Sequence, residues 1–186
     1  MQAILFREHG GPEKLSYEDL PTPTIGSEEV LVRVKACALN HLDIWIRQGI
    51  PAYSMPLPHV SGSDVSGIVE QIGNGVEGVT VGQRVFVSPG ISCWKCNQCL
   101  AGRDNLCRSY GLLGAMTHGG YAEYVKVPFR NVLPIPENLS FEQAAAFPLV
   151  SVTASHMLFA LGELQHGETV LIMGAGSGVG MIAVQM

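Results

Sequence analysis

The sequence predicts an α/β protein that opens with an antiparallel β-barrel or sandwich, up to about residue 150. Three observations support this fold class. Short β-branched runs between closely spaced glycines fill the first part of the chain, and helical patterns appear only after Ser140. Near the end, a fully apolar run leads directly into a glycine-rich turn and an apolar helix, which is typical of a parallel sheet buried on both faces.

The strands of the first part can be placed in order along the chain. Residues 2–6 and 28–36 are strand-like, and a turn-rich segment separates them. Two further runs, 66–73 and 83–89, are joined through a Gly-Asn-Gly turn, and residues 119–128 return to a strand pattern. Strands this close together favour antiparallel pairing.

The second part begins with a helix start signal. Ser140 and Gln143 form the pattern of a capping box in front of residues 141–147. Pro148 interrupts that helix, and residues 151–164 resume a helical pattern. Residues 168–173, ETVLIM, are predicted to be a buried parallel strand, and MIAVQM at the end of the sequence is predicted to be a helix.

Composition excludes several classes of protein. Only 15% of the 186 residues are charged and 47% are hydrophobic, so a folded core is expected. The net charge of −5 leaves no basic surface for nucleic acid or anionic membranes. Arg7 and Glu8 come too early for a signal peptide, and glycines interrupt the longest apolar run. We expect a soluble, cytoplasmic protein with no nucleic-acid or membrane partner.

Four of the five cysteines lie within one short segment, with the spacing C-x2-C-x2-C-x7-C. They are Cys93, Cys96, Cys99 and Cys107. Four thiolates with tight local spacing can complete a closed tetrahedral shell around Zn²⁺. Because a catalytic zinc keeps one position open, we expect this zinc to be structural.

Two other uses of these cysteines remain open from the residues alone. Iron–sulfur ligation commonly places its fourth cysteine after three residues and before proline, whereas here the gap is seven and Arg108 follows. Disulfides would require an oxidising compartment. Cys37 lies apart from the cluster and is predicted to be a small buried side chain.

The glycine-rich turn covers residues 174–180, GAGSGVG, between the predicted strand and the last helix. In that setting the backbone can approach a pyrophosphate and offer helix N–H groups to it. The candidate cofactor-binding residues are Gly174, Ala175, Gly176, Ser177, Gly178, Val179 and Gly180. A turn without any ligand is the alternative.

Several motifs together resemble one known family. They are PHVSGSDVSGIVEQIGNGV, VGQRV, the four-cysteine segment, GGYAEYV and ETVLIMGAGSGVG, in this order. The set resembles the medium-chain dehydrogenase/reductase superfamily, which includes zinc alcohol dehydrogenases and quinone oxidoreductases. The resemblance implies a GroES-like β-barrel catalytic domain over residues 1–150 with a structural-zinc lobe at 92–108. Residues 151–186 would then be the linking helix and first βα unit of a Rossmann cofactor domain, in a longer protein.

The resemblance also identifies the branch. Zinc alcohol dehydrogenases have catalytic zinc ligands where this sequence has Asn40, Ser63 and Leu149. Asn40 and the Gly-Ser-Asp triplet that contains Ser63 instead resemble quinone oxidoreductases. An unorthodox second metal site would need other ligands, and the candidates are Cys37, His41, His59 and Asp64. In an extended stretch Cys37 and Asn40 point to opposite faces, so the spacing does not bring such a site together.

This resemblance implies an NAD(P)H-dependent reductase of quinones or α,β-unsaturated carbonyls that works without catalytic zinc. It implies NADP(H) rather than NAD(H), structural Zn²⁺, a small carbonyl or quinone substrate, and a homodimer or homotetramer. Asn40, Asp43, Trp45 and Tyr53 are the catalytic or pocket candidates, with Asn40 also a cofactor candidate, and Thr153 matches a family position beside the nicotinamide. A zinc alcohol dehydrogenase with a non-standard site, or a non-catalytic zinc-stapled binding module, is the alternative.

In the alignment with this family, Ala175, Ser177 and Gly180 occupy the three glycine positions of the cofactor fingerprint. Only the last of these is glycine here. Small side chains at the other two still allow a close approach of the cofactor.

Overall fold

The computed structural model describes residues 1–51 and 55–186 of the chain. The chain divides into two compact units, Met1–Ala146 and Phe147–Met186. Among the described residues, no helix has the length and apolar character needed to cross a membrane. Tyr53, one of the predicted pocket residues, lies outside the described part of the chain.

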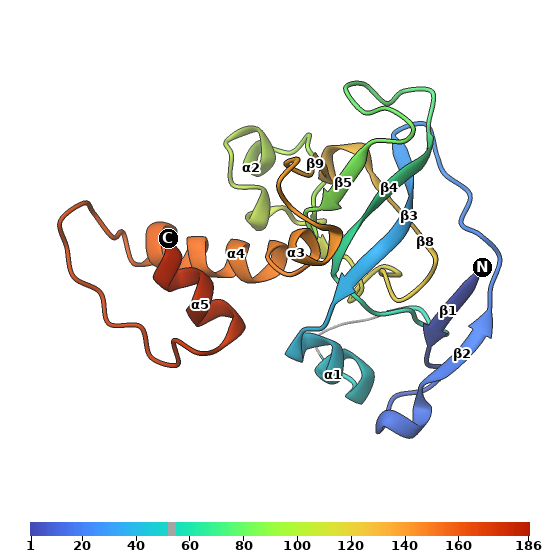
Figure 1. The fold of residues 1–186 in the computed structure, drawn as a ribbon, viewed down its shortest axis with the longest axis horizontal. Helices are drawn as coiled ribbons and strands as arrows, with labels where there is room; N and C mark the ends of the chain where they lie inside the picture. Colours follow the sequence, from blue (N-terminus) through green and yellow to red (C-terminus); the bar gives the residue numbers. More distant parts are fainter. Residues whose placement is uncertain (52–54) are drawn as a thin grey trace. The chain divides into compact units, whose positions relative to one another are not determined.

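A five-stranded antiparallel sheet forms the centre of the first unit (Figure 1). Its order is β8 (Tyr124–Pro128), β3 (Glu29–Ala38), β4 (Asp64–Ile72), β5 (Arg84–Val87) and β9 (Val132–Pro134). The predicted strands therefore form, and their antiparallel pairing is confirmed.

β-branched side chains explain both the strands and the core between them. Valine is restricted at its first side-chain torsion and packs well on a pleated surface. The buried cluster consists of Val30, Val32, Val65, Val69, Val85, Val87, Leu113, Val125, Val127 and Val132. One continuous apolar cluster thus stabilises the five-stranded sheet.

Two small sheets and several short helices complete the first unit. β1 (Gln2–Leu5) pairs with β2 (Ser16–Asp19), and β6 (Gly90–Ile91) pairs with β7 (Gly111–Leu112). The α-helices are α1 (His41–Gln48), α2 (Asn97–Leu100) and α3 (Phe141–Ala145). The 3₁₀ turns are η1 (Pro12–Lys14), η2 (Asp104–Leu106) and η3 (Phe129–Asn131).

The capping box predicted in front of α3 is confirmed. The backbone N–H of Gln143 donates to Ser140 Oγ at 3.2 Å, and the Ser140 N–H donates to Gln143 Oε1 at 2.9 Å. These bonds satisfy two N–H groups that the first turn of a helix leaves without partners.

The second unit contains α4 (Pro148–Ser155), a π-helical turn η4 (His156–Leu161) and α5 (Gly178–Gln185). Helix α4 begins at Pro148, where proline costs no hydrogen bond. The prediction of a buried strand at residues 168–173 is wrong: the segment has no strand pairing, and Leu171 and Met173 are exposed. A parallel strand is stabilised by hydrogen bonds to neighbouring strands, and no described strand pairs with this segment.

Candidate functional site

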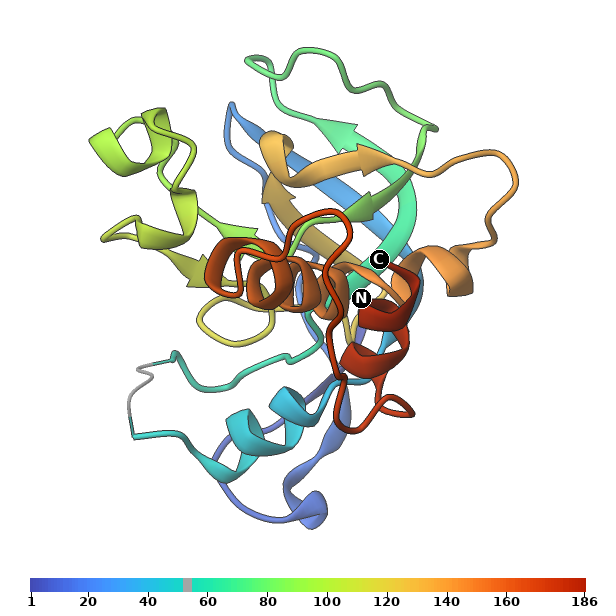
Figure 2. The same ribbon diagram turned by 90° about the vertical axis from the view of Figure 1, so that its left-hand side faces the viewer.

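The four-cysteine segment forms a lobe between β6 and β7 that projects from the sheet (Figure 2). Cys93 follows β6, Cys96 immediately precedes α2, Cys99 lies in α2, and Cys107 follows η2. Their Sγ atoms all lie within 4.8 Å of one another, and all four are free thiols. The short α2 and η2 turns thus bring the four sulfurs to one point, as the spacing predicts.

The sulfur geometry fits a tetrahedral zinc site. Cys96 Sγ and Cys99 Sγ are 3.5 Å apart, and Cys93 Sγ and Cys99 Sγ are 3.9 Å apart. Zn–S bonds of about 2.3 Å place tetrahedral sulfurs roughly 3.8 Å from one another. Because four thiolates close the coordination shell, this donor set suits a structural Zn²⁺ that cross-links the lobe.

The thiols differ in how readily they give up a proton. Backbone N–H groups of Lys95 and Cys96 hydrogen bond to the Cys93 sulfur and lower the pKa of Cys93 to about 6. Burial raises the pKa of Cys99 to about 12. Metal binding must therefore displace the Cys99 proton, which makes zinc affinity dependent on pH.

The second cluster surrounds Asp43, at the N-terminal end of α1. Its two carboxylate oxygens accept hydrogen bonds from the Asn40 backbone N–H at 2.7 Å, the Tyr121 hydroxyl at 2.7 Å and the Gly62 N–H at 3.3 Å. Asn40 lies at the start of α1, so the carboxylate that accepts its N–H also caps this helix. Three segments distant in sequence therefore meet at one carboxylate.

Asn40 joins this cluster to a second carboxylate. Its side-chain Nδ2 donates to Asp64 Oδ2 at 2.8 Å, and Asp64 is almost completely buried at the start of β4. An amide nitrogen carries two hydrogens, so one remains for another acceptor. The structure therefore brings together Asn40 and Asp43 of the predicted residues.

The residues proposed for an unorthodox second metal site do not converge. Among the residues that the structure describes, the four lobe cysteines are the one group of three or more potential ligands brought close together. Burial raises the pKa of Cys37, and the charges of Asp43 and Asp64 raise it further. Cys37 is thus held as a thiol, which is a poor metal ligand.

The other predicted pocket residue, Trp45, lies on the exposed side of α1. Half of its surface is accessible, and its ring meets that of His41 edge to face with centroids 4.8 Å apart. An accessible aromatic face is suited to stacking on a flat molecule, although the fold alone does not require it.

Cavities in the first unit place the cluster at the surface of the protein. Asp43 and Tyr121 line a cavity of about 240 Å³ with Phe6 and Ile44 among its apolar walls. A larger cavity of about 620 Å³ is lined by none of the predicted site residues. We therefore take the Asn40–Asp43 cluster, and not the cavity of about 620 Å³, as the candidate site of this unit.

The glycine-rich turn lies in the second unit and leads into α5. Ser177 caps this helix, because its Oγ accepts the Gly180 N–H at 3.0 Å. Gly174 has a φ of +69°, and a side chain on Gly180 would collide with the Gly174 carbonyl oxygen. The turn thus depends on small residues for its shape, as a close backbone approach to a ligand also requires.

Thr153 lies within α4 of the same unit. Its Oγ1 donates to the Leu149 carbonyl at 2.9 Å, so its hydroxyl hydrogen is used inside the helix. The oxygen lone pairs remain as the polar feature that Thr153 can offer to a ligand.

Comparison with known proteins identifies the family. The alcohol dehydrogenase GroES-like domain matches residues 26–137, and the chain belongs to this family. A quinone oxidoreductase from Rattus norvegicus is 35% identical over 187 residues, covering 100% of this chain and 49% of the relative. The chain thus spans about half the length of the curated relatives it matches.

Two solved structures show the same fold. One, described as an NAD-dependent alcohol dehydrogenase, is 52% identical with a TM-score of 0.95, covering 100% of this chain and 54% of its own. The other is a cobalt- and zinc-bound thermostable alcohol dehydrogenase from Pyrobaculum aerophilum, 37% identical with a TM-score of 0.91, covering 100% and 55%. The predicted medium-chain dehydrogenase/reductase family and its GroES-like fold are confirmed.

Two site residues, Tyr121 and Gly62, are not among those predicted from the sequence. Tyr121 and Gly62 are 78 and 19 residues from Asp43, to which they donate hydrogen bonds. Tyr121 lies within the GGYAEYV motif, which contributes to the family resemblance. A polar tip inside a glycine-flanked strand motif is the signal that could have pointed to it.

Proposed function

We propose that the protein containing this chain is an NAD(P)H-dependent oxidoreductase that reduces a quinone or an α,β-unsaturated carbonyl without a catalytic zinc. The observation that carries the proposal is the bond from Asn40 Nδ2 to the buried Asp64 carboxylate. Asn40 stands at the position where, by the family resemblance, zinc alcohol dehydrogenases have a ligand of the catalytic zinc. In this chain the Asn40 side chain is a hydrogen-bond donor instead. The quinone oxidoreductase relative supports this reading.

The chemistry follows from the groups available. A nicotinamide cofactor, when bound, supplies a hydride. The second Nδ2 hydrogen of Asn40 would donate to the substrate oxygen, where negative charge develops as the hydride arrives. Quinones and conjugated carbonyls spread this charge by resonance, so an amide donor suffices where a simple ketone would need a Lewis acid. Trp45 would stack on the flat substrate.

In the second unit, the turn at residues 174–180 would hold the cofactor pyrophosphate against the N-terminal N–H groups of α5. Thr153 would contact the cofactor beside the nicotinamide. We propose NADPH as the preferred cofactor, a homodimer or homotetramer as the assembly, and the cytoplasm as the location. Light scattering of the purified protein measures the assembly directly.

The test measures bound zinc and activity together in the natural protein. We expect one zinc per chain and oxidation of NADPH, faster than NADH, by a quinone or an enone. Replacing Asn40 with alanine should lower kcat by about 10²–10³-fold, because it removes an oxyanion donor. The replacement Ser27→Ala, at an exposed serine remote from the site, should leave kcat unchanged.

A second candidate is a zinc-type alcohol dehydrogenase with a non-standard catalytic site. The 52% identical solved structure, described as an NAD-dependent alcohol dehydrogenase, favours it. Two zinc ions per chain with oxidation of alcohols by NAD⁺ would establish this candidate and overturn the first. One zinc with no cofactor binding would instead support a non-catalytic zinc-stapled binding module.

A further inference from the structure

The side chain of Tyr121 reaches between two segments of the candidate site. Its hydroxyl donates to Asp43 Oδ2, the same oxygen that accepts the backbone N–H of Asn40. Its backbone N–H donates to the Ser61 carbonyl at 3.0 Å, which fixes it beside the chain that leads to Asp64. Tyr121 is thus bonded to both sides of the cluster.

The ring of Tyr121 packs against Gly62 with no spare room. A Cβ built on Gly62 would lie 2.8 Å from the ring carbon Cδ1 and 2.8 Å from Cys37 Sγ. Gly62 also has a φ of +100° and donates its N–H to Asp43 Oδ1. The ring therefore holds Gly62 in the position from which it reaches the carboxylate.

The hydroxyl is held in the form that can donate. Burial raises the pKa of Tyr121, and the hydrogen bond and charge of Asp43 raise it further. The phenol consequently stays protonated far above neutral pH. A protonated donor aimed at a carboxylate makes a charge-assisted bond, stronger than one between neutral groups.

We propose that Tyr121 is a positioning residue: through Asp43 and Gly62 it fixes the Asn40 amide relative to Asp64. Asp43 is accordingly an orienting group, because both of its oxygens are already engaged by donors of the protein. The consequence for catalysis rests on the proposed function of Asn40. The fixing of the Asn40 amide by Tyr121 does not depend on that function, so the position of the amide and its effect on catalysis can be tested separately.

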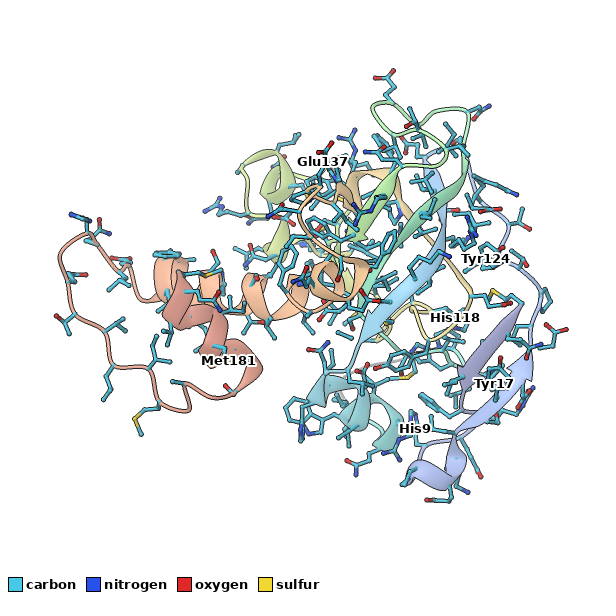
Figure 3. All side chains as sticks on the ribbon, viewed as in Figure 1. His9, Tyr17, His118, Tyr124, Glu137 and Met181 are labelled. Carbon is cyan, nitrogen blue, oxygen red and sulfur yellow. The ribbon has the colours of Figure 1, made fainter. Side chains whose placement is uncertain are left out.

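The geometric test uses NMR of the ¹⁵N-labelled chain and the replacement Tyr121→Phe. We expect the Asn40 side-chain amide and the Gly62 backbone amide to exchange with solvent about tenfold faster than in the unchanged protein, since a bond to a charged group is lost. The matched control is Tyr17→Phe, because Tyr17 lies on β2 and is 73% exposed (Figure 3). It should leave both amides unchanged.

A second replacement covers the case in which Tyr121→Phe does not fold. Asp43→Asn keeps the Tyr121 ring and removes the charge that its hydroxyl contacts, and it should loosen the same two amides. If both amides exchange within twofold of the unchanged protein in whichever of these variants folds, Tyr121 does not position Asn40 and the inference is overturned.

The catalytic test is a double-mutant cycle in the natural protein. Tyr121→Phe should lower kcat about tenfold with KM for the cofactor unchanged, because a misplaced group costs rate and not cofactor binding. In an Asn40→Ala background the same change should cost less than about twofold, since Tyr121 acts through Asn40. Equal losses in both backgrounds would contradict positioning.

The two proposals fail in different ways. Suppose that the Asn40 and Gly62 amides exchange faster in Tyr121→Phe, but that the natural protein reduces no quinone or enone. This result would support the positioning role of Tyr121 and refute the proposed function. Full activity of Tyr121→Phe, with unchanged amides, would refute the positioning and leave the proposed function intact.

Discussion

Asn40 stands between two carboxylates and donates to each of them, through its backbone N–H to Asp43 and its side chain to Asp64. This arrangement explains how two acidic groups share one partly buried cluster. Each negative charge receives N–H donors, which offset the cost of removing it from water. The same charges help to raise the pKa of Cys37, so this thiol stays neutral. The cluster is therefore built to orient an amide, and Cys37 supplies packing.

The position of Gly62 leaves no room for a side chain. Gly62→Ala should destabilise the protein, because φ is +100° and the new Cβ would lie 2.8 Å from both Cys37 Sγ and the Tyr121 ring. The matched control is Gly78→Ala, with φ of +76° and nothing within 4 Å of the built Cβ. Backbone strain alone costs about 1–2 kcal/mol, and overpacking adds about 1–3 kcal/mol. Urea unfolding of both variants measures the difference, and equal losses would refute the crowding.

Among the helices, strands and lobes, those stabilised by interactions between residues close in sequence were predicted correctly. The capping box at Ser140 and the cysteine lobe depend on residues within a few turns of one another. Helix α1, which begins at His41, was not among the predicted helices, whereas Asn40 in front of it does have an extended backbone. The segment 168–173 has the composition of a buried strand, but a strand needs partners that its own composition cannot supply.

The zinc lobe is an element whose stability should depend on its metal. Cys99→Ser should reduce bound zinc from about one per chain to nearly none, because three thiolates no longer close the shell. Amide exchange in residues 92–108 should then rise, while the five-stranded sheet, which has its own valine core, keeps its protection. Cys37→Ala is the control and should retain its zinc. Loss of zinc in this control would place Cys37 in the metal site.

In the whole molecule, the cluster around Asp43 is held by contacts between distant parts of the chain, and these contacts could not be predicted from the sequence. Asn40 was selected because the family resemblance implied a missing zinc ligand there, and the structure gave it partners. Tyr121 and Asp64 lie 78 residues from Asp43 and 24 residues from Asn40, respectively. Contacts at such separations depend on sheet order and register, which the periodicity of one sequence does not determine.

Two neighbouring histidines, the buried His59 and the exposed His118, make the stability of the first unit depend on pH. His59 is fully buried against Phe6, and His118 lies near it, with ring centroids 5.6 Å apart. Burial lowers the pKa of both, and each has one ring nitrogen within hydrogen-bonding distance of the backbone, at Gly114 and Val60. The folded protein therefore keeps both rings neutral where the unfolded chain would protonate them.

The sign of the effect follows from proton binding. Above the unfolded pKa of about 6.5 neither the folded nor the unfolded state binds protons at these histidines. Holding the two rings neutral therefore does not lower the free energy of unfolding in that range. As pH falls below that value, the unfolded chain binds more protons than the folded one, and stability is lost down to the folded pKa values. We expect the free energy of unfolding to decrease between pH 7 and pH 5, values that bracket about 6.5.

Urea unfolding of the variant His118→Gln measures this contribution. Glutamine offers an oxygen to the Val60 N–H but does not titrate, so the loss of stability between neutral and acidic pH should be smaller than in the unchanged protein. The zinc thiolates also respond to acid, but both proteins share them and their contribution cancels in the difference. His166→Gln, at an exposed position, should leave the pH dependence unchanged. If His118→Gln shows the same pH dependence as the unchanged protein, His118 does not contribute to acid sensitivity, and the loss must come from His59 or from the metal site.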